Sequence, residues 1–193
     1  MTGTILTVPG AGGDGIGFNS GNDGTLTIAV GPTGAKVNAL YISAAGVVQQ
    51  SQAQSMVRLN TANGYGSSNT CIRRFTNTVT NQGSDITYAD SATLGGSFTI
   101  NTAGVYAITY TANPSTGNAF SGVSLNTTQP TVSIASLANT SERLTIGQAY
   151  LGGANFTSNW TGYLAAGSVI RAHDDAGGAS GSANYLFTIV RIA

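Results

Sequence analysis

Apolar residues alternate with polar or small residues along most of the chain after residue 70. The alternation is clearest over residues 105–110, Val-Tyr-Ala-Ile-Thr-Tyr, and a period of two is the pattern of a half-buried β-strand. Such runs recur roughly every 8–12 residues with Gly, Asn and Ser turns between them, which is typical of an all-β sandwich or barrel. The expected strands are 71–80, 86–88, 97–100, 105–112, 122–125, 132–137, 143–151, 156–164, 168–173 and 185–192.

The segment before residue 56 is richer in glycine, and its apolar runs are shorter. A short strand at 4–8 ends at a Pro-Gly pair, and a loop is expected over 10–24. Two further strands are expected at 25–30 and 36–42. These pieces predict a small sheet, or an arm that adds strands to the sheet edge of a neighbour.

The boundary between the two patterns lies near residues 50–68. Residues 47–55 are rich in Gln, Ser and Ala and are the candidate for a helix. An extended linker is the alternative, because the segment has no clear apolar face. A short strand is expected at 56–59. The predicted divisions are an N-terminal arm or small β segment over 1–55, a linker over 56–69 and a β domain over 70–193.

Charged residues make up 7% of the 193 residues and the net charge is zero, whereas an ordinary soluble domain is roughly 25% charged. No basic excess is available to neutralise phosphates, and no run of about 18 apolar residues is present, so neither a nucleic acid nor a membrane is an expected partner. The lone cysteine, Cys71, cannot form an intrachain disulfide and is interpreted as a buried small hydrophobe rather than a reactive thiol. A surface with so little charge has little repulsion against association, which suits a protein that lives in a fixed assembly.

Two glycine-rich motifs near the N-terminus were weighed as ligand sites. Residues 10–15 match G-x-G-x-x-G after a strand, but the residues that follow cannot begin a stable helix, so no dinucleotide site is expected. Asp14 and Asp23 lie in Gly/Asp runs similar to calcium-binding repeats, but two carboxylates rarely supply the roughly six to eight oxygens that calcium needs. Both runs are interpreted as turns in which glycine provides a positive φ, and no cofactor is expected.

The densest polar cluster is His173-Asp174-Asp175. Its histidine is a candidate metal ligand or general base, but the chain has no second histidine for a zinc site, and residues 174–178 are interpreted as a solvated loop between the last two strands. Paired carboxylates for glycoside hydrolysis are a further candidate, with turns and caps as the simpler interpretation. We therefore expect no enzyme, no catalytic residue and no metal site. The acidic residues considered are Asp85, Asp90, Glu142, Asp174 and Asp175.

Two motifs resemble the C1q/TNF-like jelly-roll family. Residues 97–108, Ser-Phe-Thr-Ile-Asn-Thr-Ala-Gly-Val-Tyr-Ala-Ile, are similar to its hallmark, in which a glycine turns the chain between two strands and an aromatic residue begins a core strand. Residues 162–170 look like the family's L-x-x-G-D turn, with Ser168 in place of the usual acidic residue. The resemblance covers about residues 70–193 and implies a jelly-roll sandwich that forms a homotrimer.

Residues 72–75 and 160–164 also look like domains of tailed-phage virion proteins, in which a jelly roll follows a short N-terminal attachment segment. The collagen-like stalk of the animal C1q proteins is absent and no secretory signal is recognised, which favours the viral branch. The resemblance implies two sets of contact residues. The candidates for core and trimer are Phe98, Tyr106, Tyr110, Trp160, Tyr163, Phe187 and Ile189, and the candidates for capsid attachment are Ile5, Leu6, Val8, Leu26 and Ile28.

The resulting hypothesis is a structural protein of a tailed-phage virion, a trimeric head decoration or cement protein that binds and stabilises the capsid surface. Its partners would be further copies of the chain and, through the N-terminal segment, the major capsid protein or other virion subunits. It would lie on the surface of the phage particle after assembly in the host cytoplasm. The alternative is a receptor-binding tip, short tail fibre or head fibre whose distal loops bind a host surface glycan or protein. A third hypothesis, a glycan-active enzyme, would require a working carboxylate pair.

Overall fold

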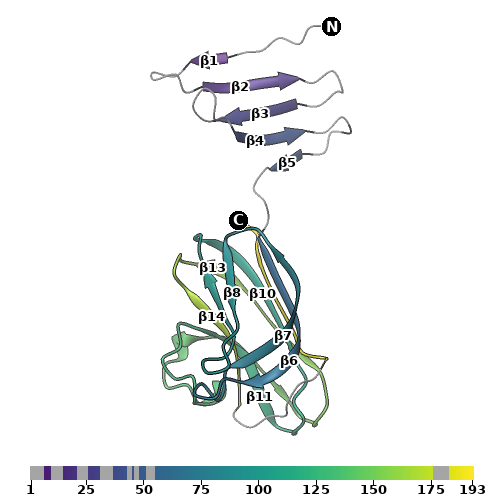
Figure 1. Cartoon of the computed structure of the whole chain (residues 1–193), viewed down its shortest axis with the longest axis vertical. Coiled ribbons are helices and arrows are strands. Elements are labelled where there is room, and N and C mark those ends of the chain that lie inside the picture. The colour runs from purple at the N-terminus through teal and green to yellow at the C-terminus, as the bar shows by residue number, and fades with distance from the viewer. Residues whose placement is uncertain are drawn as a thin grey trace. The chain divides into compact units, whose positions relative to one another are not determined.

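The chain forms two compact units, Met1–Ala53 and Gln54–Ala193 (Figure 1). The computed structural model describes residues 7–9, 15–20, 26–30, 37–42, 45, 48–50, 55–175 and 183–193. Within these residues every regular element is a β-strand, apart from two short 3₁₀ turns. The all-β prediction is therefore confirmed, and no described helix is long and apolar enough to cross a membrane.

The first unit is a single antiparallel sheet whose five strands follow one another in chain order. The strand β2 lies where a loop was expected over 10–24, because Ile16 and Phe18 alternate with glycines and the pairing with β3 overrides the low strand propensity of glycine. The strand β5 replaces the candidate helix over its three residues and pairs with β4. The strands are β1 (Thr7–Pro9), β2 (Gly15–Ser20), β3 (Leu26–Val30), β4 (Val37–Ile42) and β5 (Val48–Gln50).

The second unit is a sandwich of two antiparallel five-stranded sheets. The first sheet has the order β13-β10-β15-β6-β7 and the second has the order β12-β11-β14-β9-β8. From β9 onward the chain crosses between the sheets at nearly every connection, which is the topology of a jelly roll. The first sheet contains β6 (Met56–Tyr65), β7 (Arg73–Gln82), β10 (Gly104–Ala112), β13 (Phe156–Leu164) and β15 (Leu186–Arg191), and the second contains β8 (Ile86–Ala89), β9 (Ser97–Ile100), β11 (Ala119–Leu125), β12 (Arg143–Ala149) and β14 (Val169–Asp174).

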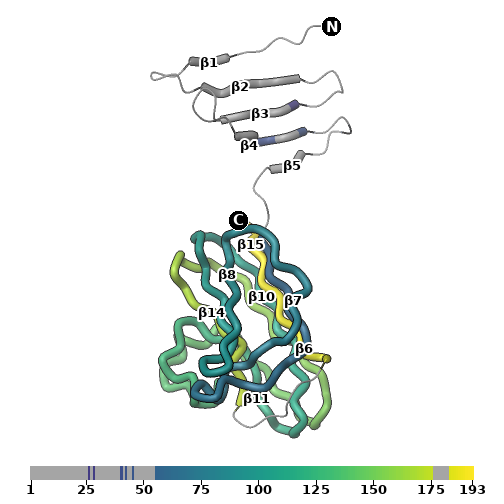
Figure 2. Tube along the Cα trace, in the orientation of Figure 1, coloured from purple at the N-terminus to yellow at the C-terminus, as the bar shows by residue number. Residues whose placement is uncertain are grey.

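The stretch expected as a linker over 56–69 is part of the jelly roll. Its strand β6 lies between β15 and β7, which Figure 2 shows beside it. The expected short strand at 56–59 is only the start of this ten-residue strand. Val57 and Leu59 are fully buried in the core, so a correct division begins the second unit at Gln54.

The core lies between the two sheets and is rich in aromatic rings. Phe98 from the second sheet stacks on Phe187 from the first, with ring centroids 4.3 Å apart. Phe187 also contacts the rings of Phe75 and Tyr110. Burial of these large side chains is the main source of the sandwich's stability.

The long connection between β11 and β12, residues 126–142, packs on part of the outer face of the second sheet, over β11, β12 and the end of β14. Its two 3₁₀ turns are η1 (Ile134–Ser136) and η2 (Thr140–Glu142), so the strand expected at 132–137 is wrong. The hydroxyl of Ser133 accepts a hydrogen bond from the N–H of Ala135 and begins η1, which ends the extended conformation. Ile134 and Leu137 of this connection are buried.

Candidate functional site

The jelly roll has two ends with different contents. The chain enters at Ser55, whose carbonyl accepts a hydrogen bond from the N–H of Arg191 near the C-terminus (Figure 1). The opposite end, here called the distal end, contains the connection between β10 and β11 and the connection between β12 and β13. Strands β6, β14 and β15 also have their distal termini there.

A buried ion pair lies inside the distal end. Arg73 begins β7 and Asp174 ends β14, and the two side chains are 1% and 3% exposed. Nε of Arg73 donates to Oδ2 of Asp174 at 2.8 Å, and Nη2 lies 2.6 Å from the same oxygen. Such a pair has to offset the cost of removing two charges from water, which requires further hydrogen bonds.

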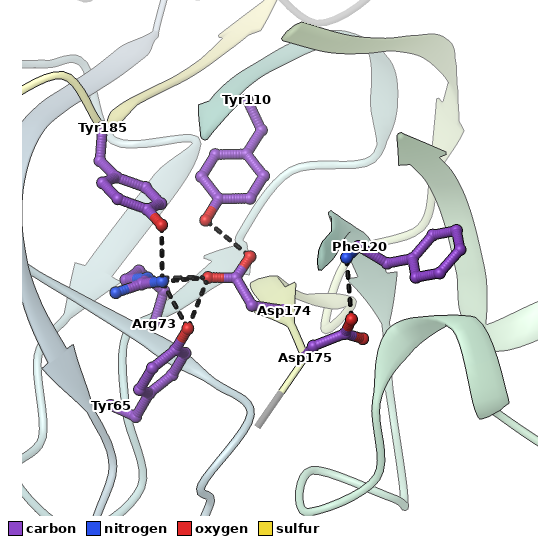
Figure 3. A network of polar contacts seen from close by, with 7 residues as sticks. All are labelled: Tyr65, Arg73, Tyr110, Phe120, Asp174, Asp175 and Tyr185. Carbon is purple, nitrogen blue, oxygen red and sulfur yellow. Dashed lines mark hydrogen bonds and ion pairs between the residues drawn. The ribbon is translucent and has the colours of Figure 1, made fainter. Parts of the chain in front are cut away.

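Three phenols supply those hydrogen bonds (Figure 3). The hydroxyl of Tyr110 donates to Oδ1 of Asp174 at 2.8 Å, and that of Tyr65 donates to Oδ2 at 3.3 Å. Nη2 of Arg73 donates to the hydroxyl of Tyr185 at 3.0 Å. The guanidinium carbon of Arg73 also lies over the rings of Tyr65 and Tyr185, 4.0 and 4.1 Å from their centroids. The cation is thus held between two aromatic faces.

The tyrosines and the arginine of this cluster remain protonated. Burial raises the pKa of Tyr185 to about 12, and burial together with the carboxylate of Asp174 raises the pKa of Tyr110 well above its usual value. Burial would lower the pKa of Arg73, but Asp174 and the phenols hold it above its ordinary value. The phenols therefore remain donors and the guanidinium remains charged at physiological pH.

A pocket of about 230 Å³ opens against this cluster. One wall carries the carboxylates of Asp174 and Asp175 with Tyr65 and Ser121, and the other is the connection between β10 and β11. Oδ2 of Asp175 accepts the backbone N–H of Phe120 at 2.8 Å, and Oδ1 accepts the hydroxyl of Ser133. Figure 3 shows the carboxylate of Asp175 directed at this N–H, with the ring of Phe120 turned away from the cluster.

The solvated loop expected over residues 174–178 is therefore wrong at Asp174, which is the last residue of β14, whereas His173 lies in a strand as expected. Both residues are buried, but on opposite faces of the strand: His173 faces the connection between β11 and β12, and Asp174 faces the interior of the sandwich. A ring nitrogen of His173, Nε2, lies 2.7 Å from the carbonyl of Val132, and burial lowers the pKa of the ring. The described residues contain no group of three or more His, Cys, Asp or Glu that could hold a metal ion.

The other acidic residues weighed for catalysis serve structural contacts. Asp85 pairs with Arg191 at 3.3 Å and Asp90 with Arg74 at 2.7 Å. Both oxygens of Glu142 accept hydrogen bonds from Thr128.

Most of the residues predicted for core and trimer lie in the core. Trp160 is half-buried against it, whereas Tyr163 is 67% exposed on the outer face of β13. Cys71 is buried, and burial raises the pKa of its thiol to about 11, as expected for an unreactive cysteine. The fully buried candidates are Phe98, Tyr106, Tyr110, Phe187 and Ile189.

The residues predicted for capsid attachment are described in part. Leu26 and Ile28 are half-buried in β3. Val8 belongs to β1, and Ile5 and Leu6 lie outside the described residues.

Sequence reasoning did not assign a role to Arg73, Tyr65 or Tyr185. A signal was present, because Arg73 shares strand parity with buried Phe75, and Asp174 shares it with Ile170 and Ala172. Opposite charges at two core-facing positions predict a buried pair, although the sequence does not say that they meet.

Comparison with known proteins yields fold neighbours alone. No family model and no curated protein matches the sequence. Solved structures similar to this chain include murine APRIL, with a TM-score of 0.49, 16% identity and coverage of 72% of this chain and 99% of that chain. Eiger TNF from S. frugiperda has a TM-score of 0.45, 12% identity and coverage of 74% and 94%. Pika GITRL has a TM-score of 0.43, 12% identity and coverage of 74% and 98%.

Proposed function

We propose that the chain is a non-enzymatic structural protein of a tailed-phage virion, a homotrimeric decoration protein on the particle surface. The observation that carries the self-association is the outer face of the first sheet. Across β10, β13 and β15 its outward positions hold no charged residue. They are Val105, Ala107, Thr109, Thr111, Thr157, Asn159, Thr161, Tyr163, Leu186, Thr188 and Val190.

The two sheets differ in what lies on their outer faces. The second sheet is partly covered by residues 126–142, whereas no described segment of the second unit covers the first. Arg58 of β6 lies beside this face, opposite Thr188, and is its nearest charged position. The uncharged part across β10, β13 and β15, with an exposed tyrosine and aliphatic side chains, has the composition of an interface core. Further copies of the chain are the occupants that we assign to it, in agreement with the trimer implied by the family resemblance.

The first unit supplies the attachment surface in this proposal. Leu26 pairs with Ile42 and Ile28 pairs with Leu40, so these four residues share one face of the sheet. All four are only half-buried. One sheet layer cannot enclose a hydrophobic core, so its apolar face requires a partner surface, which we assign to the capsid.

Self-association is tested by placing the same charge on the two sheets. Ala107→Glu introduces a carboxylate on the outer face of β10, and Ala89→Glu introduces one on the exposed edge strand β8. Sedimentation should show a trimer for the wild type and for Ala89→Glu, and a smaller species for Ala107→Glu. A monomeric wild type, or a trimer that tolerates Ala107→Glu, would contradict the proposal.

Attachment is tested on phage particles. Ile28→Lys places a charge on the apolar face of β3, and Thr27→Lys places the same charge at the neighbouring register position on the other face. Cosedimentation with particles should be lost for Ile28→Lys and kept for Thr27→Lys. Equal binding of both variants would rule out this surface.

The second candidate, a receptor-binding tip or short fibre, is favoured by one feature of the distal end. Tyr150 and Leu151, in the connection between β12 and β13, are 75% and 72% exposed. The copy number in purified particles distinguishes the two functions. Hundreds of copies support decoration, and a few trimers on the tail or at a fibre tip support receptor binding.

A further inference from the structure

We propose that the distal pocket binds a cationic side chain, the guanidinium of an arginine or the ammonium of a lysine, presented by a partner protein. This inference goes beyond the proposed function and does not depend on it. The pocket, about 230 Å³, is large enough for one side chain and smaller than a typical drug-sized cavity. Its lining residues are Tyr65, Pro114, Thr116, Gly117, Asn118, Ala119, Phe120, Ser121, Asp174 and Asp175.

The charge of Asp175 is the first argument. In the described part of the jelly roll, Asp85, Asp90 and Asp174 each have an arginine partner. Asp175 also lies in this part of the chain but has no cation within ion-pair distance. An unpaired carboxylate in a concave site attracts a cation more strongly than one on a flat surface, because the walls exclude water.

The rigidity of this carboxylate is the second argument. One oxygen of Asp175 is held by the N–H of Phe120 and the other by the hydroxyl of Ser133. Each oxygen keeps further acceptor capacity after these single bonds. A cation therefore meets a carboxylate whose orientation is already fixed, which lowers the entropy cost of binding.

The chemistry of the neighbouring wall is the third argument. Tyr65 lines the pocket, and its ring already stacks on the guanidinium of Arg73 at 4.0 Å. Asp174 also lines this wall, but its charge is balanced by Arg73 at 2.6 Å, so Asp175 supplies the net negative charge of the pocket. The wall thus offers acceptors and an aromatic edge but no described cationic group of its own other than the enclosed Arg73.

The rim indicates a protein as the source of the cation. An ideal Cβ on Gly117 would lie 2.8 Å from the carbonyl oxygen of Tyr150, so the connection carrying Tyr150 and Leu151 packs directly against the pocket wall. The N–H of Gly153 also donates to the carbonyl of Pro114 at 2.7 Å. Exposed apolar side chains beside an acidic pocket fit a protein surface on which a basic residue is flanked by apolar ones.

The test is saturation-transfer difference NMR on the full chain with N-acetyl-arginine amide as the probe. N-acetyl-citrulline amide is the matched control, because it has nearly the same shape and hydrogen-bonding groups without the charge. We expect saturation of the side-chain methylenes of the arginine probe with millimolar affinity, and no saturation of the citrulline probe. Added salt should weaken the binding.

Four variants locate the site. Asp175→Asn should weaken binding about tenfold or more, since a charge-assisted hydrogen bond is lost. Asp90→Asn removes the same charge from an exposed pair elsewhere and should leave binding unchanged. Thr116→Lys places an ammonium of the chain itself at the pocket and should block the probe, whereas Thr116→Gln should not.

Four results would overturn the proposal. Equal saturation of both probes would show that charge is not recognised, and no saturation of either would show that the pocket is not a binding site. Unchanged binding by both Asp175→Asn and Thr116→Lys would place the ligand elsewhere. Binding of neutral monosaccharides in preference to the arginine probe would identify a glycan pocket instead.

Discussion

The adjacent arginines of β7 offer a matched test of the buried cluster. Arg73→Met removes a guanidinium that is 1% exposed and leaves Asp174 buried with two phenol donors as its described partners. Arg74→Met removes a neighbouring guanidinium whose pair with Asp90 is 21% and 30% exposed. Breaking a buried pair costs about 3–5 kcal/mol, whereas an exposed pair contributes at most about 1 kcal/mol.

The assay is equilibrium urea unfolding followed by the fluorescence of Trp160, the single tryptophan, which packs against the core and so reports on the jelly roll. With a slope of about 2 kcal/mol per molar urea, Arg73→Met should lower the midpoint by about 1.5–2.5 M and Arg74→Met by less than about 0.5 M. All variants are compared at one protein concentration, because assembly adds to apparent stability. Equal shifts for the two variants would refute the buried pair. Adding Asp174→Leu to Arg73→Met should recover part of the loss, since the uncompensated carboxylate is then removed.

Three further outcomes follow from single residues. Burial lowers the pKa of His173 from its ordinary 6.5, so as the pH falls the unfolded chain takes up the proton before the folded chain does. The free energy of unfolding should therefore fall as the pH drops below 6.5. His173→Gln should reduce this dependence of the urea midpoint on pH. Thr61 is β-branched at φ 60°, so Thr61→Asn should raise the free energy of unfolding by about 0.5–1 kcal/mol and Thr61→Val should not, again by urea midpoint. Cys71 should resist iodoacetamide in the folded chain and react in urea, as read from intact mass; alkylation of the folded chain would contradict its burial.

The sequence pattern located strands best where one face is buried and the other is not. Expected strands at 105–112 and 156–164 agree with β10 and β13 within one residue, because both alternate cleanly between core and outer face. The same rule failed at 132–137, where Val132 and Ile134 keep a period of two, Leu137 breaks it, and the Ser133 hydroxyl begins a 3₁₀ turn. A hydrophobic period of two therefore predicts which side chains are buried more reliably than it predicts the backbone conformation.

The distal cluster was beyond sequence reasoning for a different reason. Arg73 and Asp174 are 101 positions apart. Tyr110 reaches the pair from β10, and Tyr185 reaches it from the position just before β15. Strand parity identifies each as core-facing, but only the sheet order brings β7, β10 and β14 to one end. The pocket depends on the same order, since its walls come from strands distant in sequence.

Attachment and recognition should be separable if the two proposals are correct. Ile28 belongs to the first unit and Asp175 to the second. Effects of substitutions that share no contacts are expected to add. Ile28→Lys should therefore abolish cosedimentation with particles and leave binding of the arginine probe unchanged. Asp175→Asn should do the reverse, and the double variant should show both losses at their single-variant size. A weaker probe signal in Ile28→Lys would contradict the separation of attachment from recognition.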